Sequence, residues 1–187
     1  CLELPKLKVG AYKNVQTGGS TGRPLKYRLS KECDDWAFAT LYRGLSRGGY
    51  RLGDKLAVMA GGSLVGKKQN FKTTLISIGM NMRKYSSYGI SNSTFQEYYD
   101  DIVSWNPRFI RGYASSIFEF AKFVDKNGYN LKFKSVFTTA EMLLDNQRKF
   151  IEDVFNAEVF NGYGLNDGGV TAFECEYHNG FHIDLER

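Results

Sequence analysis

The stretch from Thr17 to Leu25, TGGSTGRPL, combines residue types that suit the binding of phosphate. It contains three glycines, two threonines and one serine, followed by an arginine and a proline. Glycine is too permissive and proline lacks an amide donor, so the stretch favours a loop over a helix or a central strand. Short hydroxyls and bare backbone amides can approach phosphate oxygens closely. The stretch therefore indicates either a phosphate-binding loop or an ordinary surface turn.

A second stretch, GGSLVGKK, nearly matches another phosphate-binding pattern, the Walker-type loop. Gly61, Gly66 and Lys67 stand at the required spacing. The residue after the lysine should carry a hydroxyl that binds magnesium, but Lys68 stands there instead. We therefore favour the first stretch as the phosphate loop.

A possible metal cluster lies near the end of the chain. Cys175, His178 and His182 form a Cys-x2-His-x3-His pattern that contains both histidines of the sequence. Zinc binds thiolate and imidazole, but a structural zinc site requires four such ligands and this pattern offers three. A surface hairpin with ordinary histidines is the favoured interpretation, and zinc at these three residues is the alternative.

The elements that must position these residues alternate between apolar strands and amphipathic helices. Compact apolar runs predict strands at residues 55–60, 108–113, 135–139 and 158–164. Start and stop signals predict four helices, namely from near Ser30 to Gly48-Gly49, from Thr94 to Pro107, from Ser116 to Asn127-Gly128, and from Asp145 to Phe155. The starts at Thr94 and Ser116 depend on the capping-box patterns TFQE and SIFE.

This alternation predicts an α/β fold with a mostly parallel, doubly wound sheet. In such sheets, ligands bind in the crevice outside the carboxyl ends of the strands. Four polar loops, three of them with glycine, would follow the strands at that edge, namely GGS after Ala60, GYASS after Arg111, TAE after Thr138 and GYGLNDGG after Asn161. We therefore expect these loops to form a single site.

Composition narrows the class of protein. The chain has 187 residues, 42% of them hydrophobic, which is enough for one domain with a substantial core. A net charge of +5 suits anionic ligands such as nucleotides. No recognition motif for nucleic acid is present, and no apolar run approaches the roughly 20 residues that span a bilayer. Three scattered cysteines favour a reducing, cytoplasmic setting.

The motifs together resemble the adenylate-forming enzyme superfamily. TGGSTGRPL is similar to its phosphate-binding loop, YGLNDGG to its Tyr-Gly-x-[Ser/Thr]-Glu segment, and TTAE stands in the place of its adenine-side loop. The closest resemblance is to the branch of phenylacetate–coenzyme A ligases and CapK-type proteins of capsular polysaccharide clusters, which AFECEYHNGFHID also resembles. The resemblance implies that ATP and a carboxylic acid form an acyl-adenylate and pyrophosphate, and that the acyl group then passes to coenzyme A or another acceptor.

The resemblance also implies roles for individual residues. The phosphates of ATP would be held by the hydroxyls and amides of the first loop, with charge from its arginine: Thr17, Gly18, Gly19, Ser20, Thr21, Gly22 and Arg23. The adenine would be bordered by Thr139, Ala140 and Glu141, and the base would pack on Tyr163 beside Gly164. Asn166 would contact the α-phosphate, Asp167 would hold Mg²⁺, and both would act in catalysis with Thr21. The acyl pocket would be formed at Gly112, Tyr113, Ala114 and Ser115.

One departure from the family pattern leaves a second function open. Asn166 and Asp167 stand where the family has a hydroxyl residue and glutamate. Asp167 can still ligate magnesium through oxygen, and the Asn166 amide can donate to a phosphate oxygen. The alternative is a non-catalytic nucleotide- or acyl-binding relative involved in capsular polysaccharide biosynthesis. A basic nucleic-acid-binding module is a third, less favoured class.

The resemblance covers only the middle of a family member. We therefore expect residues 1–187 to be a fragment of a single AMP-binding large domain, with the start of that domain and the carboxy-terminal lid domain outside it. The family's ribose-binding aspartate and catalytic lysine would lie beyond Arg187, so the fragment alone is expected to be inactive. The expected partner is a small carboxylic acid whose identity, like that of the acyl acceptor, the sequence does not specify.

Overall fold

The computed structural model describes residues 12–16, 25–61, 78–87, 89, 91–165 and 169–186. Several predictions lie outside these residues. They are the phosphate loop from Thr17 to Arg23, most of the Walker-like stretch, and the pair Asn166 and Asp167.

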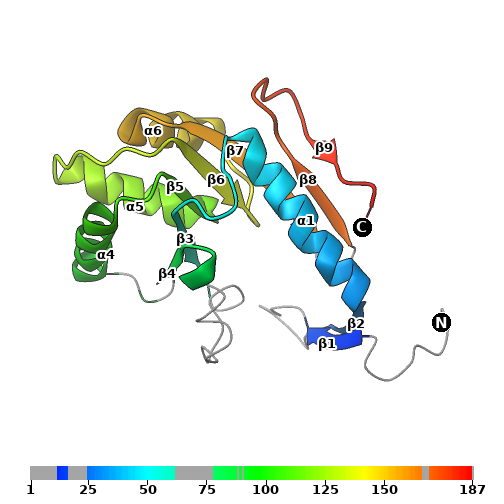
Figure 1. The fold of residues 1–187 in the computed structure, drawn as a ribbon. Helices are drawn as coiled ribbons and strands as arrows, with labels where there is room; N and C mark the ends of the chain where they lie inside the picture. Colours follow the sequence, from blue (N-terminus) through cyan, green and yellow to red (C-terminus); the bar gives the residue numbers. More distant parts are fainter. Residues whose placement is uncertain are drawn as a thin grey trace.

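Among the described residues, seven strands form one sheet in the order β4-β3-β5-β6-β7-β8-β9 (Figure 1). Their bounds are β3 Leu56–Ala60, β4 Met82–Ser86, β5 Phe109–Tyr113, β6 Ser135–Thr139, β7 Glu158–Leu165, β8 Val170–Phe173 and β9 His182–Ile183. Strands β4 to β7 of this order pair in parallel, whereas β7, β8 and β9 pair antiparallel. A separate antiparallel pair is formed by β1 (Tyr12–Gln16) and β2 (Lys26–Ser30). The mostly parallel α/β sheet that the sequence predicted is confirmed.

Helices cover both faces of the sheet, as Figure 1 shows. In β3 all five residues are buried, and successive residues point to opposite faces. Leu56, Val58 and Ala60 pack in the cluster under α1 (Lys31–Arg47). Ala57 and Met59 pack in the larger cluster on the other face, under α4 (Asn92–Trp105), α5 (Ala114–Lys126) and α6 (Asp145–Phe155). The apolar run in this strand was thus the signature of a strand buried on both sides.

The predicted helix stops are confirmed, but two predicted starts are wrong. Helix α4 begins at Asn92, because the Ser91 hydroxyl accepts the Thr94 amide proton at 3.2 Å. Helix α5 begins at Ala114 and has no side-chain cap from its own N-cap residue, Tyr113. The patterns TFQE and SIFE therefore lie inside helices. The first turn of α5 is capped by a residue that is distant in the sequence, described below. None of the described helices is long and apolar enough to cross a membrane.

Parallel pairing brings the carboxyl ends of β3, β5, β6 and β7 to one edge of the sheet. Gly112 pairs with both Met59 and Thr138, and Thr138 pairs with Asn161. A side chain on Gly112 would bring its Cβ within 2.2 Å of the Met59 carbonyl oxygen, so only glycine fits this close approach. The loops predicted to share a site therefore leave the sheet from neighbouring strands at matching heights.

Candidate functional site

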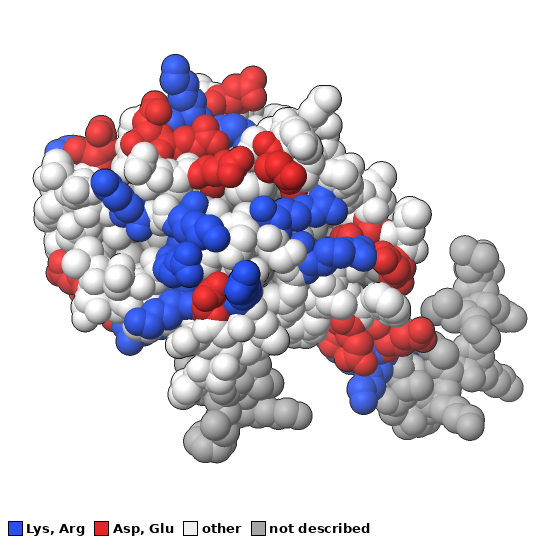
Figure 2. Space-filling view, turned by 45° about the horizontal axis from the view of Figure 1, so that its top comes forward, with Lys and Arg blue, Asp and Glu red and all other residues white. Residues whose placement is uncertain are grey.

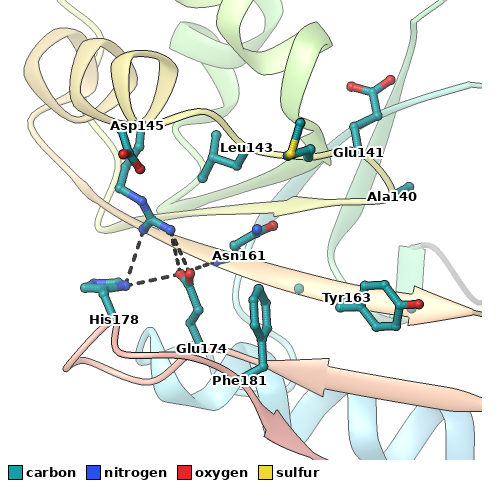
Figure 3. A pocket seen from close by; sticks show the side chains of 13 residues that line it. Ala140, Glu141, Leu143, Asp145, Asn161, Tyr163, Glu174, His178 and Phe181 are labelled. Atoms are coloured by element: carbon teal, nitrogen blue, oxygen red, sulfur yellow. Dashed lines mark hydrogen bonds and ion pairs between the residues drawn. The ribbon is translucent and has the colours of Figure 1, made fainter.

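A cavity of about 740 Å³ opens at this edge of the sheet (Figure 3). Its lining comes from the segment after β6, from α6, from β7 and from the segment after β8. The lining residues are Ala140, Glu141, Met142, Leu143, Asp145, Arg148, Asn161, Gly162, Tyr163, Gly164, Glu174, His178 and Phe181. Its volume lies in the range usual for small-molecule and cofactor sites.

Four residues that the sequence assigned to the nucleotide line this cavity: Ala140, Glu141, Tyr163 and Gly164. The Tyr163 side chain lies at the lining surface in Figure 3, and the residue is 53% exposed. A ring that is fixed by a strand and open to a cavity can stack on a base. The fifth residue, Thr139, ends β6 opposite Gly162 and does not line the cavity.

The backbone at Ala140 is strained. Its φ angle is 67°, in the left-handed region that L-amino acids with a Cβ seldom adopt. Such strain concentrates at functional sites, where the surrounding structure holds it. The strained turn redirects the chain as it leaves β6, and Glu141 follows immediately.

Glu141 connects the segment predicted to border the adenine with the predicted acyl pocket. Its Oε2 accepts the backbone N–H of Ser115 at 2.8 Å, in the first turn of α5. The first amides of a helix have no intrahelical partner, so a carboxylate there supplies the missing cap and interacts favourably with the helix dipole. The acyl-pocket residues Gly112 to Ser115 do not line the cavity, but they are joined to it through this contact.

An ion-pair network forms one wall of the cavity, as the dashed lines in Figure 3 show. Arg148 donates from Nη2 to both carboxylate oxygens of Glu174 at 2.8 Å, and it also donates to the Val159 carbonyl oxygen. Glu174 is only 6% exposed and accepts the Asn161 amide proton at 2.9 Å. The network fixes β7 against the segment that follows β8.

Sequence reasoning missed this network. Arg148 comes from α6 and Glu174 from the turn after β8, a separation of 26 residues that no local pattern spans. Asn161 was noted only as the residue before a loop. It contacts Thr138, whose hydroxyl donates to the Asn161 side-chain oxygen at 3.0 Å. The one available signal was the acidic stretch that contains Glu174, which the resemblance singled out without a role.

The predicted metal cluster has a different role in the structure. His178 lies between two carboxylates, with Nε2 2.9 Å from Glu158 and Nδ1 3.2 Å from Glu174. His182 lies exposed in β9, and Cys175 is a partly buried free thiol. Across the described part of the chain, no group of three or more His, Cys, Asp or Glu residues could hold a metal ion. The three predicted zinc ligands therefore do not form such a group.

Charged side chains of both signs mix on the surface. On the face that Figure 2 shows, Lys and Arg lie among Asp and Glu rather than in one continuous basic patch. Arg83 and Asp101 form an exposed pair at 2.5 Å, whereas the exposed Arg43 pairs with the buried Asp184 at 2.5 Å.

Comparisons with known proteins agree with this fold, although no family model matches the chain. Protein CapK of Staphylococcus aureus is 27% identical over 155 residues, which is 81% of this chain and 34% of CapK. A structure of 2-hydroxyisobutyryl-CoA ligase in complex with 2-HIB-AMP and CoA superposes with a TM-score of 0.64 at 18% identity, over 91% of this chain and 40% of that one. ATP-bound MatB from Rhodopseudomonas palustris gives 0.58 at 12% identity, over 89% of this chain and 31% of that one.

The chain therefore spans about a third of the length of CapK and less than half of the solved ligases. The chain has the fold of the adenylate-forming acyl-CoA ligases, and its resemblance to that superfamily, first seen in its motifs, is confirmed.

Proposed function

We propose that this chain binds ATP in the cavity beside β7 and that the whole protein activates a carboxylic acid to an acyl-adenylate. The observation that supports this proposal most is the lining of the cavity. Residues from two separate motifs, Ala140-Glu141 and Tyr163-Gly164, meet there at the carboxyl ends of neighbouring parallel strands. Similar folds have been solved with bound ATP and with an acyl-adenylate analogue.

The proposed reaction is an in-line substitution at phosphorus. An oxygen of the ionised carboxylate forms a bond to the α-phosphorus, and the bond from that phosphorus to the pyrophosphate oxygen breaks. The carboxylate carries no proton, so the protein needs no general base. Positioning and charge neutralisation are the tasks that remain.

The residues proposed for those tasks follow the sequence motifs. Amides and hydroxyls from Thr17 to Gly22 would hold the β- and γ-phosphates, with Thr21 nearest the chemistry and Arg23 adding positive charge. Asn166 would contact the α-phosphate, and Asp167 would hold Mg²⁺, which supplies further charge neutralisation when bound. Glu141 and Tyr163 would place the adenine. In a second step, coenzyme A or another acceptor would take the acyl group, as in a phenylacetate–CoA ligase.

ATP–pyrophosphate exchange by the full-length protein tests this proposal. Exchange should require both magnesium and a carboxylic acid. Asp167→Asn should slow it on the order of 100-fold, because the carboxylate proposed to hold the metal is lost. The same variant should keep its melting temperature, since Asn matches Asp in volume and a substitution in a loop, as the sequence predicts there, changes stability by roughly 0.5 kcal/mol or less.

The test also distinguishes the second candidate function. A parent protein that binds AMP but exchanges no pyrophosphate with any acid would be a non-catalytic nucleotide-binding relative. The 27% identity to CapK, together with the Asn166-Asp167 departure, motivates keeping this candidate.

A further inference from the structure

Arg111 is a charged residue in the middle of the sheet. It lies on the central strand β5, opposite Val58 of β3 and Phe137 of β6. These two neighbours belong to the apolar cluster under α1, as do Phe109 and Tyr113 at the alternate positions of β5. Arg111 therefore faces the α1 side of the sheet, among side chains that offer no charge.

No carboxylate of the described residues pairs with this guanidinium. The groups that act on it electrostatically are the hydroxyls of two tyrosines, Tyr42 of α1 and Tyr113 of β5. Arg111 is half-buried, and this burial lowers its pKa, as expected for a cation partly removed from water without a counter-charge.

An uncompensated guanidinium in such surroundings is costly unless another group neutralises it. A planar guanidinium matches a carboxylate with two parallel hydrogen bonds, and tyrosine hydroxyls can add to them. Arg111 immediately precedes Gly112 to Ser115, the segment that the resemblance assigns to the acyl pocket. The missing charge is therefore one that a substrate in that pocket can bring.

We propose that Arg111, flanked by Tyr42 and Tyr113, is a specificity-determining residue that selects a carboxylic acid carrying a second carboxylate. One carboxylate reacts with ATP while the other binds Arg111. This inference rests on the proposed function, because it names the substrate class for that reaction. A nucleotide phosphate is the less favoured ligand, because the nucleotide cavity is lined from β7 and from the segments after β6 and β8, whereas Arg111 lies on β5.

Ligand binding without turnover provides the first test. Melting temperatures of the full-length protein are compared with dicarboxylic acids from malonate to adipate and with monocarboxylic acids of the same length. At least one dicarboxylic acid should raise the melting temperature, and its monocarboxylic partner should not. Arg111→Met, which keeps an unbranched side chain and removes the charge, should abolish that shift, and Arg111→Lys should keep part of it. Arg83→Met, an exposed arginine of the same sheet, is the control and should leave the shift unchanged.

Exchange kinetics provide the second test. For the stabilising dicarboxylic acid, Arg111→Met should lower kcat/KM for pyrophosphate exchange at least about 10-fold, the usual size of a hydrogen bond to a charged group. The effect should lie in the KM for the acid, with the KM for ATP unchanged. Exchange with the monocarboxylic partner should not fall.

Several outcomes would overturn the inference. They are the absence of a shift with every dicarboxylic acid, an equal shift in Arg111→Met, and a rise in the KM for ATP instead of the KM for the acid. The two proposals fail separately. An Arg111-dependent shift without any exchange would reject the acyl-adenylate function and keep the dicarboxylate site. Exchange that is unchanged in Arg111→Met would keep the acyl-adenylate function and reject the dicarboxylate site.

Discussion

Arg148 and Arg111 lie in two regions of one sheet and differ in how their charges are neutralised. Arg148, 21% exposed at the side chain, binds both oxygens of Glu174 and the Val159 carbonyl. Arg111 has apolar neighbours on the adjacent strands and no acidic partner among the described residues. The ion pair of Arg148 stabilises the structure around the cavity. An arginine without an acidic partner, such as Arg111, can instead bind a ligand that carries the missing negative charge.

The difference follows from the strands involved. After β7 the sheet becomes antiparallel, and the turn that follows β8 brings Glu174 against α6. Strand β5 is flanked on both sides by parallel strands, β3 and β6, whose residues are almost all buried and include no acid. The first arrangement brings an acid to its arginine, whereas the two strands that flank Arg111 offer none.

The largest effect is expected from breaking the neutralised pair. Glu174→Ala would leave Arg148 without its carboxylate and the Asn161 amide without its acceptor, so unfolding free energy should fall by ~3 kcal/mol. Urea denaturation measures the loss. The double variant with Arg148→Met should lose less than the sum of the two single changes, and simple additivity would contradict the pairing.

Arg111→Met should have a smaller effect with the opposite sign. Replacing an uncompensated cation by an unbranched apolar side chain should stabilise the unliganded protein by about 1 kcal/mol. The same urea denaturation measures it. A loss of stability comparable to that of the Glu174 variant would mean that Arg111 serves the fold.

Substitutions of Glu141 should change stability still less. This residue lines the cavity and also contacts the first turn of α5, so it links the cavity to the segment that follows Arg111. Glu141→Ala removes the cap from the Ser115 amide, and because Glu141 is exposed the loss should be about 0.5–1 kcal/mol. Glu141→Gln keeps an acceptor and should lose about half of that. In pyrophosphate exchange by the full-length protein, Glu141→Ala should raise the KM values for both ATP and the acid. An effect on the KM for ATP alone would argue against the coupling.

The exposed arginine Arg43 should give the smallest effect. Its hydrogen bonds lower the pKa of Glu186 from 4.5 to about 2. Because the carboxylate is favoured in the folded state, its contribution is complete above pH 4.5 and is lost as the pH falls towards 2. Glu186→Gln should therefore flatten acid denaturation in that window and leave stability at neutral pH almost unchanged. Superimposable acid curves for the parent and the variant would show that the pair contributes nothing measurable.

The sequence predicted the elements better than the contacts between them. The apolar run at Leu56–Ala60 and the stop at Asn127-Gly128 are local signals, and both are confirmed. Helix α5 was predicted to start too late, because its cap comes from Glu141, a residue 26 positions away. Tyr163 was assigned to the nucleotide from its motif alone, and the structure places it in the cavity lining.

Whether an arginine has an acidic partner could not be predicted from local sequence patterns. Arg148 and Arg111 both follow apolar or amphipathic patterns, and neither pattern reveals whether an acid lies within reach. Pairing across the sheet decides it. The ion-pair network around Glu174 was therefore missed, and the open charge at Arg111 became visible only through the register of β5 with its two neighbours.

The central claim is that the cavity beside β7 is the nucleotide site, and calorimetric titration of AMP into the full-length protein tests it most directly. Tyr163→Ala should weaken AMP binding about 10-fold or more, the usual value of one base stacked on an aromatic ring. Tyr177→Ala, which removes an 80% exposed tyrosine outside the cavity lining, should leave the affinity unchanged. Equal affinity in the parent and in Tyr163→Ala would contradict the assignment of this cavity to the nucleotide.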